Sequence, residues 1–303
     1  MMLPGCRPCL QLLVLILACA VGRSEAQTTQ AQPPQPQPLP SQSSQAQPPQ
    51  SQSSLELVDP KTLRVCADPR NMPFSTQAGE GFENKLAELF ARKLGKDLAY
   101  EWYPQATGFV RMTLMQRRCD VVMGYPLGDD LVQPTNPYYR SAYALIFKPG
   151  TGLDGIEDLE DPRLKDKRIG VVAGTPPSDN MAAAGLMAHA KPYPLVIDTR
   201  YDSSAEAMVH DLDAGVIDAG VLWGPIAGYY AKQAKSPISL VLLTKEKSGP
   251  PMTYRIVMGV RRTDQDWKRE LNSLISANQK DIDHLLLSYG VPLLDEKDNQ
   301  IKE

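Results

Sequence analysis

The sequence is poor in the side chains that bind transition metals or act as general bases at neutral pH. Its three histidines, His189, His210 and His284, are far apart, and none has another histidine or a cysteine at metal-ligand spacing. A G-x-S-x-G elbow, a phosphate-binding P-loop and an H-E-x-x-H motif are also missing. The sequence therefore predicts a protein that is not an enzyme and has no catalytic residues, no metal site and no cofactor of its own.

Long apolar runs are missing as well, apart from one near the start. Residues 10–21 form a largely apolar stretch that follows Arg7 and precedes Ser24-Glu25-Ala26. A run this short does not span a bilayer comfortably, so residues 1–26 are interpreted as a cleaved signal peptide for export to the periplasm. A second interpretation is a lipid-anchoring site at Cys19, after Ile16-Leu17-Ala18. The mature chain is expected to have no transmembrane segment.

An excess of basic charge is absent too. Removing residues 1–26 leaves 30 of the 32 basic and 34 of the 35 acidic residues, a net charge of −4. A nucleic-acid-binding protein would show a basic excess in clusters, so the charge balance argues against that class. The short basic pairs Arg117-Arg118 and Arg261-Arg262 are interpreted as solvated surface charges.

Residues 27–54 contain no charged side chain, and Leu39 is their only large apolar one. Glutamine, proline and serine make up nearly all of this segment. It cannot bury enough apolar surface to offset the entropy of ordering it, so we expect a disordered tether. The alternative is a low-complexity insertion without a role.

From residue 55 onward, short apolar strands alternate with amphipathic helices, which is typical of an α/β fold with parallel sheets. Residues 63–67 are predicted to form a strand, and 82–94 a helix that ends at Gly95. Further helices are predicted over 109–117 and from Gly174 through about His189. Strands are predicted over 120–123, 168–173 and 218–223.

Three groups of motifs, in order along the chain, resemble type II periplasmic solute-binding proteins over the whole folded region. They are LRVCADPRNMPF at 63–74 with GEGFENKLAELFARKLG at 79–95, RRCDVVMG at 117–124 with NPYYRSAYALIF at 136–147, and KRIGVVAGTPPSDN at 167–180 with DLDAGVIDAGVLWGPIA at 211–227. The resemblance implies a two-lobed α/β fold, each lobe a mostly parallel sheet flanked by helices. Lobe 1 would comprise 55–141 and 253–303, and lobe 2 would comprise 142–252. Ligands of such folds bind between the lobes, near helix amino ends whose N–H groups favour anions.

Amino-acid binders of that family hold the substrate carboxylate with an arginine that lies between the third strand and a Pro-Tyr-Tyr segment. They hold the ammonium group with an aspartate at the end of a strand in lobe 2. Here residues 125–135 contain no basic residue, and Trp223 stands where the aspartate would be. A zwitterion desolvated without charged partners loses several kcal/mol. The substitutions therefore argue against amino-acid capture.

Five residues are expected to line the cleft: Asp68, Arg111, Tyr125, Thr175 and Trp223. Each has a plainer alternative. Asp68 and Thr175 could cap turns, Arg111 could lie on a solvated helix face, and Tyr125 and Trp223 could fill the cleft as packing. The sequence leaves open whether the cleft binds any ligand.

Cys66 and Cys119 are the only cysteines outside the first 26 residues. Export favours a disulfide between them. Their expected places on neighbouring strands, one late and one at the start, put them several residues apart, which is beyond disulfide reach at about 3.3 Å per residue. The sequence leaves this bond open.

Several motifs are similar to the MxaJ/XoxJ group: VCADPRNMPFS, EGFENKLAELFA, GFVRMTL, CDVVMGYP and NPYYRSAYA. That group accompanies pyrroloquinoline-quinone (PQQ) methanol dehydrogenases in the periplasm of methylotrophs. The resemblance implies a non-catalytic accessory role in assembly or activation of the dehydrogenase. The PQQ and its calcium or lanthanide ion would belong to that partner, and its cytochrome c is a further candidate partner. The alternative is the solute-binding component of an ABC transporter for a small molecule that is not an amino acid.

Overall fold

The computed structural model describes residues 57–302. The expected signal peptide (1–26), the tether (27–54) and the alternative anchor at Cys19 lie outside these residues. Within 57–302, none of the helices combines the length and the apolarity that a bilayer span requires.

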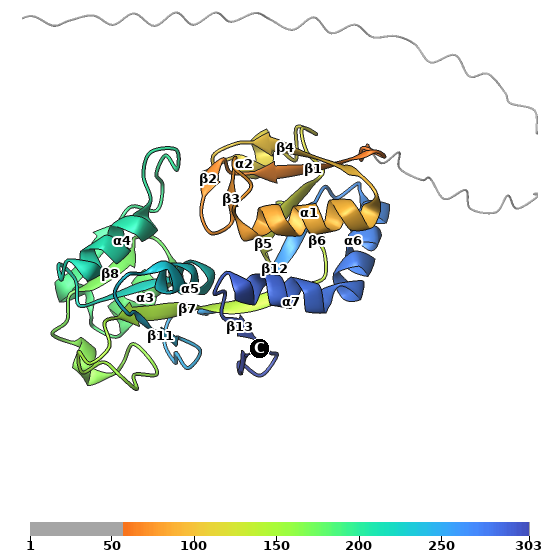
Figure 1. Ribbon diagram of the computed structural model, residues 1–303. Helices are drawn as coiled ribbons and strands as arrows, with labels where there is room; N and C mark the ends of the chain where they lie inside the picture. The colour runs from red at the N-terminus through yellow and green to blue at the C-terminus, as the bar shows by residue number, and fades with distance from the viewer. Residues whose placement is uncertain (1–56, 303) are drawn as a thin grey trace, which may run out of the picture. The chain divides into compact units, whose positions relative to one another are not determined.

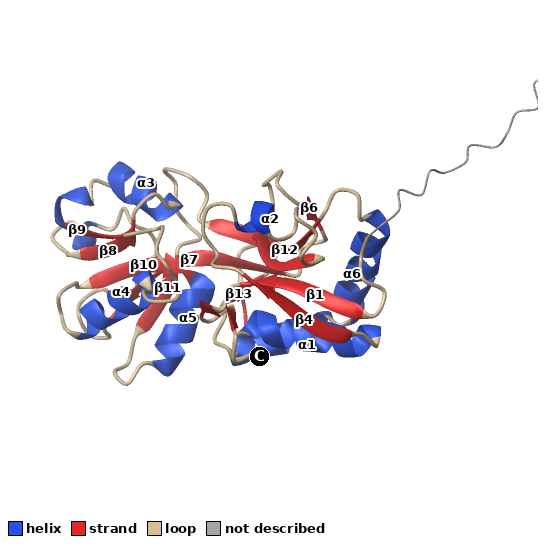
Figure 2. Ribbon diagram, turned by 90° about the horizontal axis from the view of Figure 1, so that it is seen from above, coloured by secondary structure: helices blue, strands red, loops and turns tan. Residues whose placement is uncertain are grey.

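A ten-stranded mixed sheet runs through the described chain (Figure 2). Its hydrogen-bonded order is β4-β1-β5-β12-β7-β10-β8-β9, with β11 beside β7 and β6 beside β12. The strands of this sheet are β1 (Thr62–Ala67), β4 (Asp97–Trp102), β5 (Val121–Pro126), β6 (Gln133–Pro134), β7 (Tyr139–Phe147), β8 (Ile169–Val172), β9 (Ala190–Tyr193), β10 (Ala219–Trp223), β11 (Ser239–Leu242) and β12 (Thr253–Val260). Two short antiparallel pairs stand apart: β2 (Arg70–Asn71) with β3 (Ser75–Thr76), and β13 (Leu293–Leu294) with β14 (Gln300–Ile301).

The sheet is parallel toward its two ends and antiparallel in the middle. β4, β1 and β5 run parallel, and so do β10, β8 and β9, as the alternation of strands and helices predicts. β12 and β7 run antiparallel to their neighbours and join these two parts. We call the strands β4, β1, β5, β12 and β6, with the helices, loops and short strands β2 and β3 attached to them, the first half. The strands β10, β8, β9 and β11, with their helices and loops, are the second half.

Helices pack on both halves (Figure 1). The first half carries α1 (Phe82–Leu94), α2 (Phe109–Met112), α6 (Gln265–Ala277) and α7 (Gln279–Ser288). The second half carries α3 (Pro176–Ala183), α4 (Ser204–Asp213) and α5 (Gly224–Gln233). Two 3₁₀ turns, Pro162–Leu164 and Met187–His189, complete the regular structure.

The helix α1 follows the predicted periodicity. Phe82, Leu86 and Phe90, spaced four residues apart, are fully buried on one face. Gly95 ends the helix at φ 64°, a left-handed conformation that glycine adopts at no steric cost.

Two other helices are shorter than predicted. The helix expected over 109–117 ends at Met112, and the following turns lead to Arg117 at φ 59°. The helix expected through His189 ends at Ala183, because Gly185 lies at φ 74° and breaks it. The local sequence pattern therefore overestimated the length of both helices.

Strand alternation sorts the core into separate clusters on the two faces of the sheet. Val65 and Val121 belong to the core cluster that includes residues of α1, α6 and α7, whereas Cys66 and Val122 belong to the cluster of α2. The second half repeats this arrangement. Val221 packs on the side of α3 and Leu222 on the side of α4 and α5.

The structure joins Cys66 and Cys119 in a disulfide, with their Cα atoms 5.4 Å apart. The sequence argument against the bond assumed that Cys119 begins the second strand. In the structure β5 begins only at Val121, and Cys119 lies in the bend before it. Both cysteines are buried next to Leu114. The bend brings Cys119 back toward β1, which is why the estimate from strand register was wrong.

Arg261 corrects a second expectation. It was interpreted as a solvated charge, but it is only 5% exposed. Its guanidinium donates to the Asp120 carboxylate at 2.6 Å and to the Cys119 carbonyl at 2.6 Å. Arg64 binds the same carboxylate through two hydrogen bonds of 2.7 Å. Two adjacent arginines in the sequence do not indicate that one of them forms a buried ion pair with an aspartate far away in the chain.

Candidate functional site

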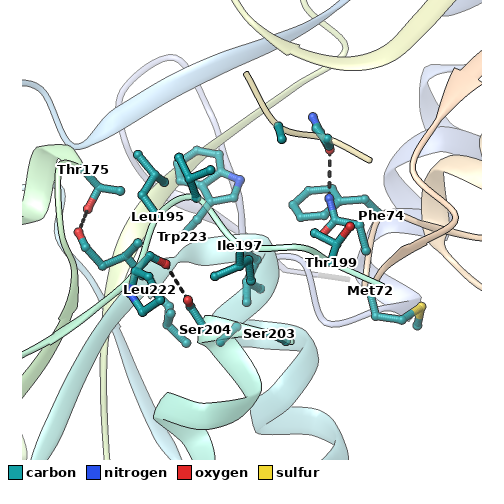
Figure 3. Close-up of a pocket in the computed structure, with 18 of the residues that line it drawn as sticks. Met72, Phe74, Thr175, Leu195, Ile197, Thr199, Ser203, Ser204, Leu222 and Trp223 are labelled. Carbon is teal, nitrogen blue, oxygen red and sulfur yellow. Dashed lines mark hydrogen bonds between the residues drawn. The ribbon is translucent and has the colours of Figure 1, made fainter. Parts of the chain in front are cut away.

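A cavity of about 450 Å³ lies where residues of both halves of the sheet meet (Figure 3). Its volume falls in the range of small-molecule sites in proteins. No charged residue is among the described residues that line it. These are Asn71, Met72, Phe74, Gln105, Ala106, Thr107, Tyr143, Val172, Thr175, Pro194, Leu195, Val196, Ile197, Thr199, Ser203, Ser204, Ala205, Val221, Leu222, Trp223 and Ile226.

Three helices of the second half begin at the cavity, and their amino ends are poor anion sites. The helix α3 begins with Pro176-Pro177, and α5 has Pro225 in its first turn. Proline has no N–H group, so these turns lack donors that an anion would bind. In α4 the Ser203 hydroxyl accepts a hydrogen bond from the backbone N–H of Glu206. The described cavity wall therefore has no charged side chain, and fewer backbone donors than usual are free at these helix starts.

An aromatic cluster forms one wall. Trp223 packs edge to face on Tyr143 and Tyr254, with ring centroids 5.3 and 5.8 Å away. Such pairs contribute about 0.5–1.5 kcal/mol beyond the area they bury. Burial, together with the neighbouring Tyr254, raises the pKa of Tyr143 to about 12, so its hydroxyl stays neutral. Trp223 is thus held in the wall, and open space remains beside it.

Of the five residues expected in the cleft, Thr175 and Trp223 line this cavity. The Thr175 hydroxyl is directed back to the Val172 carbonyl, to which it donates at 2.6 Å. Asp68 lies beneath the surface, 1% exposed, and is not part of the lining. Its carboxylate accepts the backbone N–H groups of Arg70 and Gln105 at 2.8 and 2.5 Å. These hydrogen bonds stabilise the backbone turns at Arg70 and Gln105.

Arg111 and Tyr125 line a separate cavity of about 300 Å³ beside α2. The two cavities share only the residues 105–107 of their walls. Burial, then a hydrogen bond to Asp129, raises the pKa of Tyr125 above its ordinary value. Arg111 is exposed and makes no hydrogen bond or ion pair to the rest of 57–302. Of the five residues expected in one cleft, the structure thus brings Thr175 and Trp223 to the larger cavity and Arg111 and Tyr125 to its neighbour, with Asp68 in neither lining.

The sequence reasoning missed the segment 194–203, which connects β9 to α4 and which we call the strap. It supplies six of the residues that line the larger cavity: Pro194, Leu195, Val196, Ile197, Thr199 and Ser203. In Figure 3, Leu195 and Ile197 lie near Trp223, and Thr199 lies beside Phe74 and Met72. The available signal was three consecutive apolar residues, 195–197, in a stretch with neither strand alternation nor helical spacing.

The fold and these sites can now be compared with known proteins. The crystal structure of the periplasmic binding protein XoxJ from Methylobacterium extorquens AM1 is 43% identical and superposes with a TM-score of 0.67, covering 77% of this chain and all of that one. The chain belongs to the MoxJ/MxaJ/XoxJ family of periplasmic binding proteins. MxaJ from Methlophaga aminisulfidivorans MPT superposes equally well, with a TM-score of 0.67 at 30% identity and the same coverage.

Curated relatives agree with this family. Protein MoxJ of Methylorubrum extorquens is 30% identical over 252 residues, which cover 78% of this chain and 83% of the relative. Protein MoxJ of Paracoccus denitrificans is 26% identical, covering 80% and 92%. A search against protein-family models finds no match. An ancestral cationic amino-acid solute-binding protein also shares the fold, with a TM-score of 0.60 and 25% identity over 76% of this chain and 95% of that one.

The MoxJ/MxaJ/XoxJ family therefore shares its fold with binders of charged solutes, while in this chain the cavity wall is uncharged. Within 57–302, no three His, Cys, Asp or Glu side chains are grouped so that they could hold a metal ion. The described site could pack against an apolar group of a ligand and form hydrogen bonds with a neutral polar group.

Proposed function

We propose that this protein is a non-catalytic periplasmic accessory protein of a PQQ-dependent methanol or alcohol dehydrogenase system, acting in assembly or activation of the enzyme. The observation that carries the proposal is the uncharged wall of the cavity, in a chain whose relatives are MoxJ, MxaJ and XoxJ. A solute-binding fold without charged ligand contacts suits a protein that acts through its surface.

The cavity chemistry supports this against capture of a charged solute. An amino acid would have to leave water without a guanidinium for its carboxylate or a carboxylate for its ammonium group. Desolvating either charge without a partner costs several kcal/mol. The prolines at the starts of α3 and α5 remove backbone donors as well. An ionic solute therefore has little to gain here.

The same reasoning assigns the redox chemistry to the partner. PQQ carries several carboxylates, and its metal ion needs oxygen ligands held together. The cavity lining contains no basic residue for the carboxylates, and residues 57–302 contain no group of three potential metal-ligating side chains for the ion. Both observations support our proposal that PQQ and the metal ion belong to the dehydrogenase. Its electron-accepting cytochrome c is a second candidate contact.

The test begins with deletion of this gene in its host. Alcohol oxidation, and the amounts of PQQ and metal bound to the purified dehydrogenase, are measured in periplasmic extracts before and after adding back the purified protein. Loss in the deletion strain and recovery on addition are expected. Normal dehydrogenase amount, cofactor content and activity in the deletion strain would refute the accessory role.

The cavity volume favours a second candidate, the solute-binding component of an ABC transporter for a neutral small molecule. A cavity-blocking variant separates the two functions. Thr107 is exposed at the cavity wall, so Thr107→Phe adds a ring there without entering the buried core. An accessory protein that acts through its surface should still restore dehydrogenase activity with this substitution. Loss of uptake of a solute, with dehydrogenase activity intact, would support the transporter.

A further inference from the structure

The strap (194–203) is tied at its base and at its tip. At the base, the Ser204 hydroxyl donates to the Pro194 carbonyl at 2.5 Å, so the two ends of the segment are held together. At the tip, Tyr201 N–H donates to the Asp198 carbonyl at 3.0 Å, which closes a turn. The strap belongs to the second half, between β9 and α4.

The strap also bonds directly to the first half. The Thr199 hydroxyl donates to the Asp68 carboxylate, with its Oγ1 3.2 and 3.0 Å from the two carboxylate oxygens. The Arg70 guanidinium donates to the Arg200 carbonyl at 2.5 Å. Asp68 follows β1, and Arg70 begins β2. Hydrogen bonds to an ionised acceptor are about twice as strong as neutral ones.

Asp68 is a fixed acceptor for this contact. It is 1% exposed, and the backbone N–H groups of Arg70 and Gln105 hold both of its oxygens. Asn71 and Gln105 bond to each other and line the cavity. The position of the Asp68 carboxylate is therefore set by the first half alone, and Thr199 reaches an acceptor that is already in place.

The strap completes the cavity from the second half. Leu195, Val196 and Ile197 line it from the side of the strap, opposite Met72 and Phe74 of the first half. A solute that bridged the two halves would have to contact residues of both halves at once. Here the chain makes such contacts with its own side chains.

We propose that the hydrogen bond between Thr199 and Asp68 is a latch that holds the strap of the second half on the first half without any bound solute. Opening of this latch would widen access to the cavity. The latch explains how a solute-binding fold keeps one fixed surface in the absence of a ligand. It does not rest on the proposed accessory role, because the contact would act in the same way in a transporter component.

The experiment compares the mature protein with Thr199→Val, which has nearly the same shape but no hydroxyl, and Thr199→Ser, which keeps the hydroxyl. Thr107→Val is the matched control, because Thr107 also lines the cavity and its hydroxyl makes no hydrogen bond within the described chain. Hydrogen exchange of the peptide covering 194–203 reports opening. Acrylamide quenching of Trp223, isolated by subtracting a Trp223→Phe variant, reports access to the cavity.

Thr199→Val should raise the population of the open strap about tenfold or more, because the lost bond has a charged acceptor. Exchange of 194–203 and quenching of Trp223 should rise together. Thr199→Ser and Thr107→Val should behave like the wild type. The latch is wrong if Thr199→Val also matches the wild type, or if Thr199→Ser opens the strap as much as Thr199→Val does. Unchanged exchange in 82–94, within α1, shows that the variants are folded.

Discussion

Replacing Asp120 with asparagine should destabilise the protein much more than the same change at Asp218. The two aspartates have the same local chemistry in the two halves of the sheet. Asp120 precedes β5 and accepts two hydrogen bonds from the Arg64 side chain, and Asp218 precedes β10 and accepts two from the Arg168 side chain. They differ in burial. The Asp120 side chain is 1% exposed and the Asp218 side chain is 31% exposed.

The expected magnitude follows from that difference. Asparagine at 120 would leave the Arg261 guanidinium, 6% exposed, with Asp264 as its remaining acidic neighbour at 2.7 Å. Removing one partner from a buried ion pair costs about 3–5 kcal/mol. An exposed pair such as Arg168 with Asp218 contributes about 1 kcal/mol or less. At roughly 2–4 °C per kcal/mol for a domain of this size, Asp120→Asn should lower Tm by roughly 10 °C.

Urea unfolding of the two variants and the wild type provides the measurement. Tryptophan fluorescence is a suitable signal, because the Trp267 indole donates to the Asp120 main-chain carbonyl at 3.1 Å. Circular dichroism of the same samples checks that the transition is global. The reasoning fails if the two substitutions lower the free energy of unfolding by similar amounts, or if Asp120→Asn costs less than about 1 kcal/mol.

Three further outcomes are expected. No common free amino acid should raise the Tm, although a ligand at a hundred times its Kd would add about 2.7 kcal/mol of stability; a clear thermal shift, or a change in Trp223 fluorescence, would contradict this. Replacing Cys66 and Cys119 by alanine should lower the free energy of unfolding by about 4 kcal/mol, because the bond closes a loop with a sequence separation of 53; an unchanged urea midpoint, in the variant and in the reduced wild type, would disprove it. Burial, with the nearby Asp68, raises the pKa of Glu83 from 4.5 to about 8. Between these values the folded state binds a proton that the unfolded state has lost, so stability should fall as pH rises, by up to about 1.4 kcal/mol per unit. Glu83→Gln should remove this slope and be more stable than the wild type at pH 8, as pH-dependent urea unfolding would show; parallel profiles would refute the assignment.

Part of the site could be predicted from the sequence, and part could not. The sequence predicted Thr175 and Trp223 at the cleft, and both line the larger cavity. Arg111 and Tyr125, expected at the same cleft, line the neighbouring cavity beside α2.

The sequence by itself determined the family, the alternation of strands and helices, and the buried face of α1. The family is indicated by the resemblance of short motifs. The alternation of elements and the buried face of α1 follow from the spacing of neighbouring residues, 2.0 or 3.6 per repeat, which is a local property. Tertiary structure alone decided the disulfide, the burial of Arg261 beside Asp120, and the contact of the strap with Asp68. These contacts join residues 53, 141 and 131 positions apart. Their partners are set by how the strands cross between the halves, which no local pattern records.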